Sequence, residues 1–502
     1  MATSRQSKKP APPKDLRELR ASGVNLQDLL TRSENVHEVS CGAANGRSLP
    51  SSVIALNDSG NARRFVSLHG ENLRFDHSSG TWYVWDGIYW RADLDGEVKR
   101  RARNVPSSLA KEAAEKPDSK EVDAFLKFAR ATGDKKRLDA LIALAASNEA
   151  IALTQNELNA DPMLLGTQNG FIELTTGEFH QPARNKLITK SVGCRYESKA
   201  RAKIWDEFLA TVFDHDCELI SFLQRWCGYC LTADTREQKF LFLFGSGANG
   251  KSTFIETLKT LLGDYGQKAP ESLFVLDPHG QGATATNDLA RLPGVRVCIG
   301  SELADGRWLN ESRIKDLTGG DSITARFLRR EFFDFHPTRK LIIYGNHQPQ
   351  IRGTDHGMWR RVLMVPFKVT IADKDKDPTL ALKLCQELPG ILNWCIEGCL
   401  AWQRHGLNPP ASVLAAVECY REEQDIVGRF LTEKCDTHPA RKIEKAILFE
   451  AFRQFSNHEF GSFEITSNRF TRELKARGFR EGQRSSHQRF WEGLTLSPRT
   501  PQ

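Results

Sequence analysis

The spacing of apolar residues changes several times along the chain, and each change predicts a different kind of element. Apolar positions recur every three or four residues between 138 and 144 and again between 205 and 226, which indicates amphipathic helices. The run TWYVWDGIYWRA (81–92) places Asp86 and Gly87 between two aromatic stretches, a pattern typical of a β-hairpin. The run KFLFLF (239–244) has no polar position after its lysine, as expected for a strand buried on both faces.

Short apolar strands and helical segments then alternate as far as about residue 367. The strands GVRVCIG (294–300) and KLIIYG (340–345) follow KFLFLF in this order. Such alternation predicts an α/β fold with a mostly parallel sheet. From residue 440 the pattern predicts helix, helix and strand, for which we expect a winged-helix domain with Thr466 or Ser467 capping its second helix and Phe470 and Leu474 facing inward.

These patterns divide the chain into five predicted segments. Residues 1–55 are expected to form a disordered basic arm and linker, 56–195 an α+β domain, 196–236 a helical linker that contributes to oligomerisation, 237–410 the α/β domain and 411–502 the winged-helix domain. The first 14 residues lack the apolar stretch of a signal peptide, and no run of about 18 apolar residues occurs anywhere. We therefore expect a soluble cytoplasmic protein.

Composition limits the classes of protein without choosing one. The 502 residues are 40% hydrophobic and 26% charged, which is ordinary for a globular protein and excludes fibrous and membrane classes. The net charge of +7 permits a polyanionic partner. Among the 11 cysteines, Cys227 and Cys230 form the one C-x-x-C pair, without a second pair at zinc spacing nearby, so we expect reduced thiols packed in a core.

The strongest chemical signal follows the strand KFLFLF directly. The sequence GSGANGKS (245–252) matches G-x-x-x-x-G-K-[ST], and a helical run comes after it. Glycines let successive backbone N–H groups surround a phosphate, while Lys251 would reach the β- and γ-phosphates and Ser252 would ligate Mg²⁺. We therefore expect ATP and Mg²⁺ at Gly245, Ser246, Gly247, Ala248, Asn249, Gly250, Lys251, Ser252 and Thr253.

Further polar residues follow the next strands and would complete an ATPase site. Glu302 ends the segment GVRVCIGSE and is placed to orient or deprotonate the attacking water. Asn346 follows the third strand, where a sensor of the γ-phosphate would lie. Arg360 and Arg361 could reach the nucleotide of a neighbouring subunit, although an arginine pair is also common on a solvated surface.

Taken together, these motifs resemble those of the superfamily III helicases of the AAA+ type, and most closely the phage and plasmid primase-helicase family related to the poxvirus primase-helicase. The resemblance extends over about residues 56–500 and rests on the ordered segments GSGANGKST, SELADGRW, IKDLTGGDSITARFL and FFDFHPTRKLIIYGNHQPQIRGTDHGMWRRV. It implies an AAA+ core with residues 245–253 as the Walker A loop. It further implies Glu302 as the Walker B acid, which would also ligate the metal, Asn346 as sensor 1, and Arg360 or Arg361 as the arginine finger.

The resemblance also implies how the protein would meet DNA. In relatives, the element between Walker B and sensor 1 carries a hairpin into the central channel of a ring. That element corresponds here to residues 315–330. Its arginines flank Phe327 and would contact phosphates, while the aromatic side chain of Phe327 would stack on bases. The implied partners are single-stranded and forked DNA and further copies of the chain in a hexamer. A separate primase is an optional partner. The implied location is the cytoplasm of a bacterial host that carries a phage or plasmid. The cations concerned are Lys315, Arg326, Arg329 and Arg330.

Three features qualify what the resemblance implies. Many family members carry two adjacent acids at Walker B, whereas Ser301 precedes Glu302 here, so the division between metal ligand and general base stays open. Asp93 and Asp95 form the one D-x-D of the N-terminal region, with no evident third acid or His partner, so we expect a loop and no primer synthesis. The basic segment 471–502 would grip duplex or forked DNA through phosphates, or else dock a protein.

The leading interpretation is an ATP-dependent replicative DNA helicase of a phage or mobile element, forming a ring on single-stranded DNA. Two alternatives stay open. One is another P-loop ATPase, such as a DNA-packaging motor or a kinase. The other is a non-catalytic initiator or scaffold that ATP switches between states.

Overall fold

A computed structural model describes residues 54–276, 285–300, 307–326, 332–351, 356–460, 466–483 and 489–497. These residues all lie in one of the two units into which the chain divides, Ile54–Gln502. Three of the predicted site residues, Glu302, Arg329 and Arg330, lie outside the described residues. No helix within these ranges is both long and apolar enough to cross a membrane.

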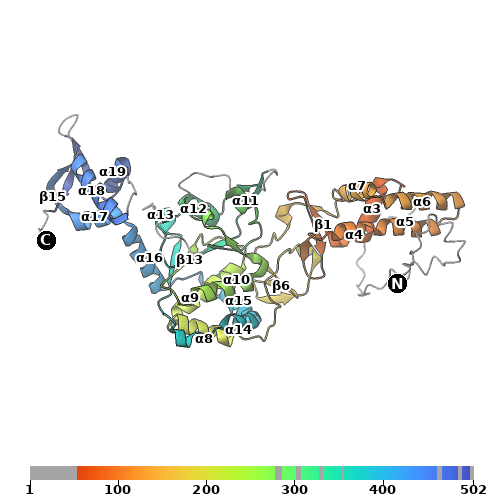
Figure 1. Cartoon of the computed structure of the whole chain (residues 1–502), viewed down its shortest axis with the longest axis horizontal. Helices are drawn as coiled ribbons and strands as arrows, with labels where there is room; N and C mark the ends of the chain where they lie inside the picture. The colour runs from red at the N-terminus through yellow and green to blue at the C-terminus, as the bar shows by residue number, and fades with distance from the viewer. Residues whose placement is uncertain are drawn as a thin grey trace, which may run out of the picture. The chain divides into compact units, whose positions relative to one another are not determined.

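Between residues 54 and 153 the described chain forms an α+β module with helices α3 to α7 and a four-stranded sheet (Figure 1). The predicted hairpin is present, because β2 pairs antiparallel with β3 and the Asp86 carboxylate accepts hydrogen bonds from the turn amides of Ile88 and Tyr89. Trp90 is fully buried in it. The elements are α3 (Asp58–His69), β1 (Leu73–Asp76), β2 (Thr81–Trp85), β3 (Trp90–Ala92), α4 (Glu97–Ala102), α5 (Asn104–Ala114), α6 (Ser119–Thr132), α7 (Lys135–Ala145) and β4 (Ala152–Leu153), with strand order β3-β2-β1-β4.

A small antiparallel sheet and two amphipathic helices follow. The sheet consists of β5 (Leu164–Thr167), β6 (Gly170–Glu173) and β7 (Glu178–His180). The predicted helical spacing between 205 and 226 is realised in α8 (Lys203–Val212) and α9 (Cys217–Leu231). Both helices bury their apolar face against one side of the central sheet.

The central sheet has five strands, all parallel, in the order β14-β8-β13-β10-β9. The prediction of a mixed α/β fold with a parallel sheet and an N-terminal α+β module is therefore confirmed. Strand β8 has an uninterrupted apolar run because both of its faces are buried. Leu241 and Leu243 face the core on one side of the sheet, while Phe240 and Phe242 face the core on the other. The elements are β8 (Phe240–Phe244), α10 (Lys251–Leu262), β9 (Gly266–Ala269), α11 (Ala285–Ala290), β10 (Val297–Gly300), α12 (Glu311–Thr318), β11 (Ile323–Ala325), β12 (Phe333–Phe335), β13 (Lys340–Gly345), α13 (His356–Trp359) and β14 (Val362–Pro366).

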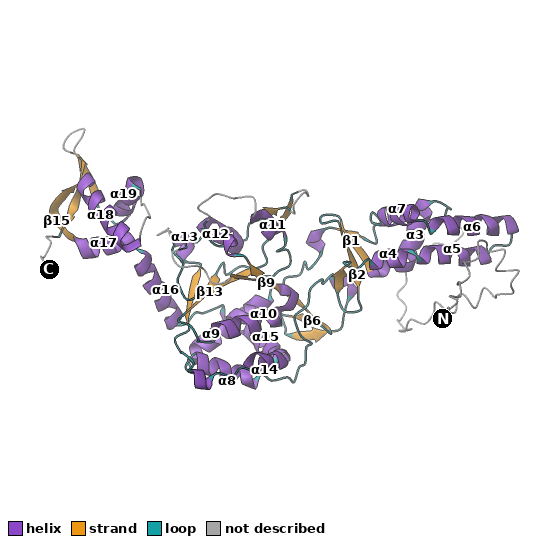
Figure 2. Ribbon diagram, in the orientation of Figure 1, coloured by secondary structure: helices purple, strands orange, loops and turns teal. Residues whose placement is uncertain are grey.

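Helices close the sheet on both faces, as Figure 2 shows. On one face α15 (Leu388–His405) crosses α9 so tightly that a side chain at Gly228 would clash with the backbone of Cys399. Cys227 and Cys230 lie fully buried and unpaired at this crossing, so the prediction of core thiols is confirmed. The same region contains α14 (Leu380–Gln386), and α16 (Ala411–Gln424) packs on the opposite face through Tyr420.

The C-terminal part differs from the predicted helix, helix and strand. Thr466 caps α19, and Phe470 and Leu474 are buried as expected. Two further strands occur, one before the helices and one after them. The sequence pattern did not predict them, because their residues are mostly polar and do not alternate with apolar ones. The order is α17 (Ile426–Lys434), β15 (Cys435–Glu444), α18 (Lys445–Phe460), α19 (Ser467–Ala476), β16 (Arg480–Gln483) and β17 (Arg489–Leu496), with an antiparallel sheet β15-β17-β16.

A candidate nucleotide-binding site

The loop between β8 and α10 has a backbone shape that few sequences allow. Ala248 and Gly250 both adopt positive φ angles, 57° and 83°. Gly245 also has a positive φ, and a side chain there would clash with the carbonyl oxygen of Phe367, which follows β14. The first and last glycines of the predicted motif are therefore required by the backbone and by close packing. Gly247 has no atom near the place of its missing side chain.

The buried side chain of Asn249 stabilises this loop through hydrogen bonds. Its side chain is 3% exposed, and its amide nitrogen donates to the carbonyl oxygens of Ser246 and, at 3.3 Å, of Phe367. Its amide oxygen accepts from the ammonium group of Lys251 at 3.1 Å. Asn249 thus joins the loop to the end of β14 and to the lysine, a role that its unspecified position in the motif did not indicate.

Lys251 and Asn346 come together at the carboxyl edge of the sheet. Strands β8 and β13 are neighbours, and their register pairs Phe244 with Gly345, so the residues that follow both strands meet. The Lys251 ammonium lies 3.2 Å from Asn346 Oδ1 and also donates to the carbonyl oxygen of Gly245 at 2.6 Å. Lys251 is only 4% exposed, so its charge is held among oxygens at the bottom of the loop.

A cavity of about 1020 Å³ opens beside the loop. One wall is formed by α8, and the other by residues 371–383, where the backbone N–H of Ile371 donates to the carbonyl oxygen of Ala248 at 2.8 Å. The hollow is large enough for a nucleoside next to the start of α10. Its lining includes Ile204, Phe208, Val212, Ala248, Thr253 and Leu380.

Two ligands were predicted for Mg²⁺, and only Ser252 is among the described residues. Its side chain is exposed on the first turn of α10, where a hydroxyl can reach a cation held by phosphates. Strand β10 ends at Gly300, which pairs with Ile343 of β13, so the chain leaves this strand at the same edge as Asn346. Within the described ranges no cluster of three or more His, Cys, Asp or Glu side chains could hold a metal.

Arg360 and Arg361 have opposite environments. Arg361 is 8% exposed, and its guanidinium donates to Thr318 Oγ1 at 3.2 Å and to the carbonyl oxygen of Gly357. Arg360 is exposed, and its guanidinium donates to Gln238 Oε1 at 2.9 Å. Both lie at the amino edge of the sheet, since Phe240 donates its backbone N–H to the carbonyl oxygen of Arg361.

Arg361 therefore ties two elements together. Thr318 is the last residue of α12, the helix that carries Lys315 and leads to the β11–β12 hairpin. The hydrogen bond to Thr318 fixes the end of this helix to the start of β14, the strand next to β8. This link was not visible in sequence, because 43 residues separate the two partners.

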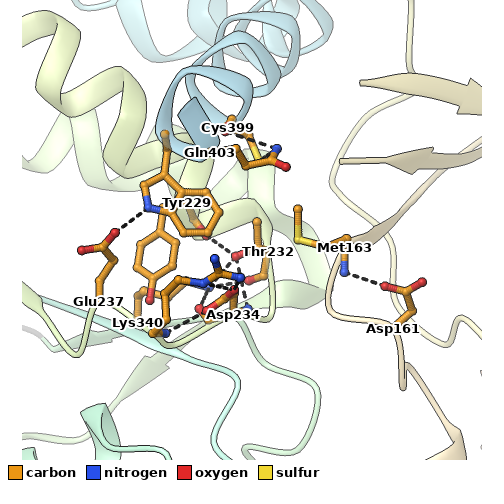
Figure 3. Close-up of polar contacts among 11 residues, drawn as sticks. Asp161, Met163, Tyr229, Thr232, Asp234, Glu237, Lys340, Cys399 and Gln403 are labelled. Atoms are coloured by element: carbon orange, nitrogen blue, oxygen red, sulfur yellow. Dashed lines mark hydrogen bonds and ion pairs between the residues drawn. The ribbon is translucent and has the colours of Figure 1, made fainter. Parts of the chain in front are cut away.

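Buried cations hold the amino ends of the inner strands, as Figure 3 shows for Lys340. The Lys340 ammonium donates to the carbonyl oxygens of Thr232 and Asp234 and lies 4.6 Å from the ring centre of Tyr229. Burial lowers the pKa of Lys340 from its ordinary value of 10.5 to about 7. These contacts fix strand β13 to the segment that leads from α9 into β8.

The D-x-D of the N-terminal module is structural. The Asp93 carboxylate accepts hydrogen bonds from the backbone N–H groups of Glu97, at 2.7 Å, and Val98, so it caps the start of α4. Asp95 forms ion pairs with Arg100 and Arg91, and the Arg100 guanidinium is the main cause that lowers the pKa of Asp95 to about 2. Both acids are committed to local contacts, as expected for a loop.

Comparison with known proteins points to one family. A model described as D5 N terminal like matches residues 62–214, and a family of unknown function matches residues 243–361. The chain is 28% identical over 305 residues to "Putative helicase L207/L206" of Acanthamoeba polyphaga mimivirus and 25% identical over 310 residues to "Putative primase C962R" of African swine fever virus. Each match covers 56% of this chain and 32% of the relative. These matches support the resemblance to the poxvirus-type primase-helicase family.

The chain spans only about a third of the length of each of these two relatives. A further relative, "Putative helicase 022R" of Frog virus 3, is 27% identical over 270 residues, which is 50% of this chain and 27% of that protein. Among solved structures, the C-terminal region of NrS-1 matches with a TM-score of 0.46 and 9% identity over 84% of this chain and 96% of that one. The three named relatives are viral proteins, and the bacterial host stays a prediction.

Proposed function

We propose that this protein is an ATP-dependent DNA helicase that works as a ring, with hexameric assembly as predicted from its motifs. The observation that carries the proposal is the convergence of Lys251, Asn249 and Asn346 on a strained phosphate loop at one edge of a parallel sheet. The family relationship supports an enzyme acting on DNA, since relatives bear the names helicase and primase.

In the proposed site the phosphates of ATP lie on the loop at the N-terminus of α10, and the nucleoside lies in the neighbouring cavity. Lys251 contacts the β- and γ-phosphates, and Asn346 holds the lysine and senses the γ-phosphate. Ser252 and Glu302 would hold Mg²⁺, which when bound would neutralise charge on the phosphates. Glu302 also orients the attacking water, with Ser301 beside it in place of a second acid.

Arg360 is our candidate for the arginine finger, and it would act on the neighbouring subunit. Arg361 is unsuited because its guanidinium is buried and bonded within its own chain. Arg360 lies at the amino edge of the sheet, one strand length of about 17 Å from the phosphate loop at the carboxyl edge. An exposed guanidinium that cannot reach its own nucleotide can complete the site of the next copy in a ring.

The DNA partner would be held by the element from α12 through the β11–β12 hairpin, with Lys315 and Arg326 among its cations and Arg329 and Arg330 outside the described residues. The Arg361–Thr318 hydrogen bond gives a route from the nucleotide-binding sheet to this element. We propose that changes at the nucleotide move the hairpin along the DNA strand.

We further propose that the C-terminal part is a winged-helix domain that grips duplex or forked DNA. Its order of helix, strand, two helices and two strands supports this, and Asn468, Arg472 and Lys475 lie on the exposed side of α19. For residues 1–55, 56–195 and 196–236 we propose the segments that the sequence predicts, with the same bounds. Because Tyr420 of α16 packs against the central sheet, we propose that the ATPase domain ends after α16 near Asp425 and not at residue 410.

The proposal is tested by ATP hydrolysis with and without single-stranded DNA, for the wild type, Lys251→Ala, Arg360→Ala and a mixture of the two variants. We expect DNA-stimulated hydrolysis that each substitution abolishes. Mixing should restore part of it, because an interface between the two variants combines an intact Lys251 with an intact Arg360. Normal hydrolysis by Lys251→Ala would refute the site.

Unwinding of a tailed duplex separates a helicase from the other two classes of protein. A packaging motor or kinase would hydrolyse ATP without displacing the strand. A scaffold that ATP only switches would show no turnover with saturating Mg-ATP and DNA.

A further inference from the structure

Gln238 lies in the short segment between α9 and β8 and has a backbone shape that glutamine seldom adopts. Its φ angle is 52°, in the left-handed region that favours glycine and asparagine. Its backbone N–H donates to the carbonyl oxygen of Thr235 at 3.0 Å, which closes a tight turn just before β8. Strained residues of this kind persist only where the surrounding structure holds them, and they are concentrated at functional sites.

This turn brings two successive side chains to one residue, Arg360. Gln238 Oε1 accepts a hydrogen bond from the Arg360 guanidinium at 2.9 Å, and the Lys239 ammonium donates to the carbonyl oxygen of Arg360 at 2.7 Å. In an extended strand, successive side chains point to opposite faces, so the positive φ of Gln238 accounts for this convergence. Both the main chain and the guanidinium of Arg360 are therefore held by the segment that enters β8.

The segment is itself anchored before it reaches Gln238. The Lys340 ammonium donates to the carbonyl oxygens of Thr232 and Asp234. The Glu237 carboxylate accepts a hydrogen bond from the indole N–H of Trp402 at 2.8 Å. These anchors come from β13 and α15, so Gln238 holds Arg360 from a support that is fixed to the sheet and to a covering helix.

We infer that Gln238 is a positioning residue that directs the Arg360 guanidinium toward the nucleotide of the neighbouring copy. The inference rests on the proposed function, because it requires Arg360 to be the arginine finger. A guanidinium carries several N–H donors, and the bond to Gln238 uses one of them, so the others stay available for phosphate oxygens. A long side chain that is already held also loses less conformational freedom when the phosphate arrives.

The competing role of Gln238 is an ordinary surface contact that stabilises the fold. A neutral side-chain hydrogen bond near the surface returns little stability, whereas a left-handed glutamine backbone costs stability. The strained turn is therefore better explained by the placement of Arg360 than by folding.

The test measures DNA-stimulated ATP hydrolysis by the full chain carrying Gln238→Met, which keeps the side-chain length and removes the accepting oxygen. We expect kcat to fall on the order of tenfold to a hundredfold, as for a misplaced catalytic group. KM for ATP should be unchanged, because the lost contact acts in the transition state. Gln238→Asn should show the same loss, because its side chain is shorter, without a lower Tm, because asparagine adopts a positive φ more readily.

Arg236→Ala is the matched control within the same segment. The Arg236 guanidinium is exposed and bonds to Asp234 at 2.6 Å, and not to Arg360. This variant should keep the wild-type kcat.

Mixtures of variants show on which site the loss falls. Gln238→Met mixed with Lys251→Ala should regain hydrolysis, since the first copy keeps its phosphate loop and the second supplies an intact finger. Gln238→Met mixed with Arg360→Ala should regain none, because every finger in the mixture is defective. The opposite pattern would mean that Gln238 supports the phosphate loop of its own chain, and it would overturn the inference.

The inference also fails if Gln238→Met hydrolyses ATP as fast as the wild type or faster, or if Arg236→Ala loses as much activity. In those cases the proposed finger stands, provided that Arg360→Ala is inactive. Normal hydrolysis by Arg360→Ala would instead remove the proposed finger, and the role of Gln238 with it.

Discussion

The Lys251 ammonium and the Asn346 side-chain oxygen are 3.2 Å apart at the carboxyl edge of the sheet, although 95 residues separate them in the chain. The contact exists because β8 and β13 are adjacent parallel strands that end at the same level. Asn346 is therefore placed to hold the lysine and to respond to whatever charge the lysine meets.

Replacing Asn346 by alanine should reduce kcat for ATP hydrolysis by about two orders of magnitude, an effect of the size that a lost polar contact to a transition state produces. Stability should be almost unchanged, because Asn346 is exposed and Lys251 keeps its bonds to Gly245 and Asn249. Steady-state kinetics and thermal melting measure the two effects, with the exposed neighbour His347→Ala as a control. A normal kcat would contradict the sensor role.

The adjacent arginines should give opposite results. Arg361→Met should lower stability by about 2 kcal/mol, since it removes charged hydrogen bonds from a buried group and leaves Thr318 without that partner. Arg360→Ala should change stability by less than about 0.5 kcal/mol, as is usual for exposed side chains, and should abolish hydrolysis. Urea unfolding and ATPase assays distinguish the two variants. The assignment is reversed if Arg361→Met melts normally and Arg360→Ala hydrolyses normally.

Two glycines of the phosphate loop form a matched pair for a stability test. A methyl group at Gly245 would overlap the carbonyl oxygen of Phe367 and strain a positive φ, whereas one at Gly247 meets no atom. Gly245→Ala should thus lower Tm by several degrees without nucleotide, consistent with a strain of about 1–3 kcal/mol. Gly247→Ala should keep the wild-type Tm. Equal melting of the two variants would show that the loop does not pack on β14 as described.

Lys340 should make stability depend on pH in the alkaline range. Its folded pKa is lowered to about 7 from 10.5, so between these values the unfolded chain binds more protons than the folded one. The free energy of unfolding of the wild type should therefore rise with pH across this window relative to that of Lys340→Met, and the difference should be flat below about pH 7. Chemical unfolding at pH 6, 7, 8 and 9 provides the comparison, and a constant difference throughout would contradict a buried, depressed lysine.

The glycine-rich loop between β8 and α10 and the parallel sheet could be predicted from the sequence for a physical reason. A continuous apolar strand needs cover on both faces, and neighbouring parallel strands deliver their following residues to a common edge. Asn249 escaped notice because its partner Phe367 lies 118 residues away. The sequence could not distinguish Arg360 from Arg361, because they differ only in burial: Arg360 is exposed to solvent and Arg361 lies in the core. Strand β15 was missed because its middle is polar and exposed.

The two edges of the sheet also determine how mixtures of good and bad copies would behave. The phosphate loop lies at one edge and Arg360 at the other, so in the proposed ring each copy serves two sites, its own and that of one neighbour. A copy lacking only Lys251 or only Arg360 would damage one site, whereas a copy lacking both would damage two. The double variant should therefore be the stronger dominant inhibitor when expressed beside the wild type, and a small fraction of it should silence most assemblies.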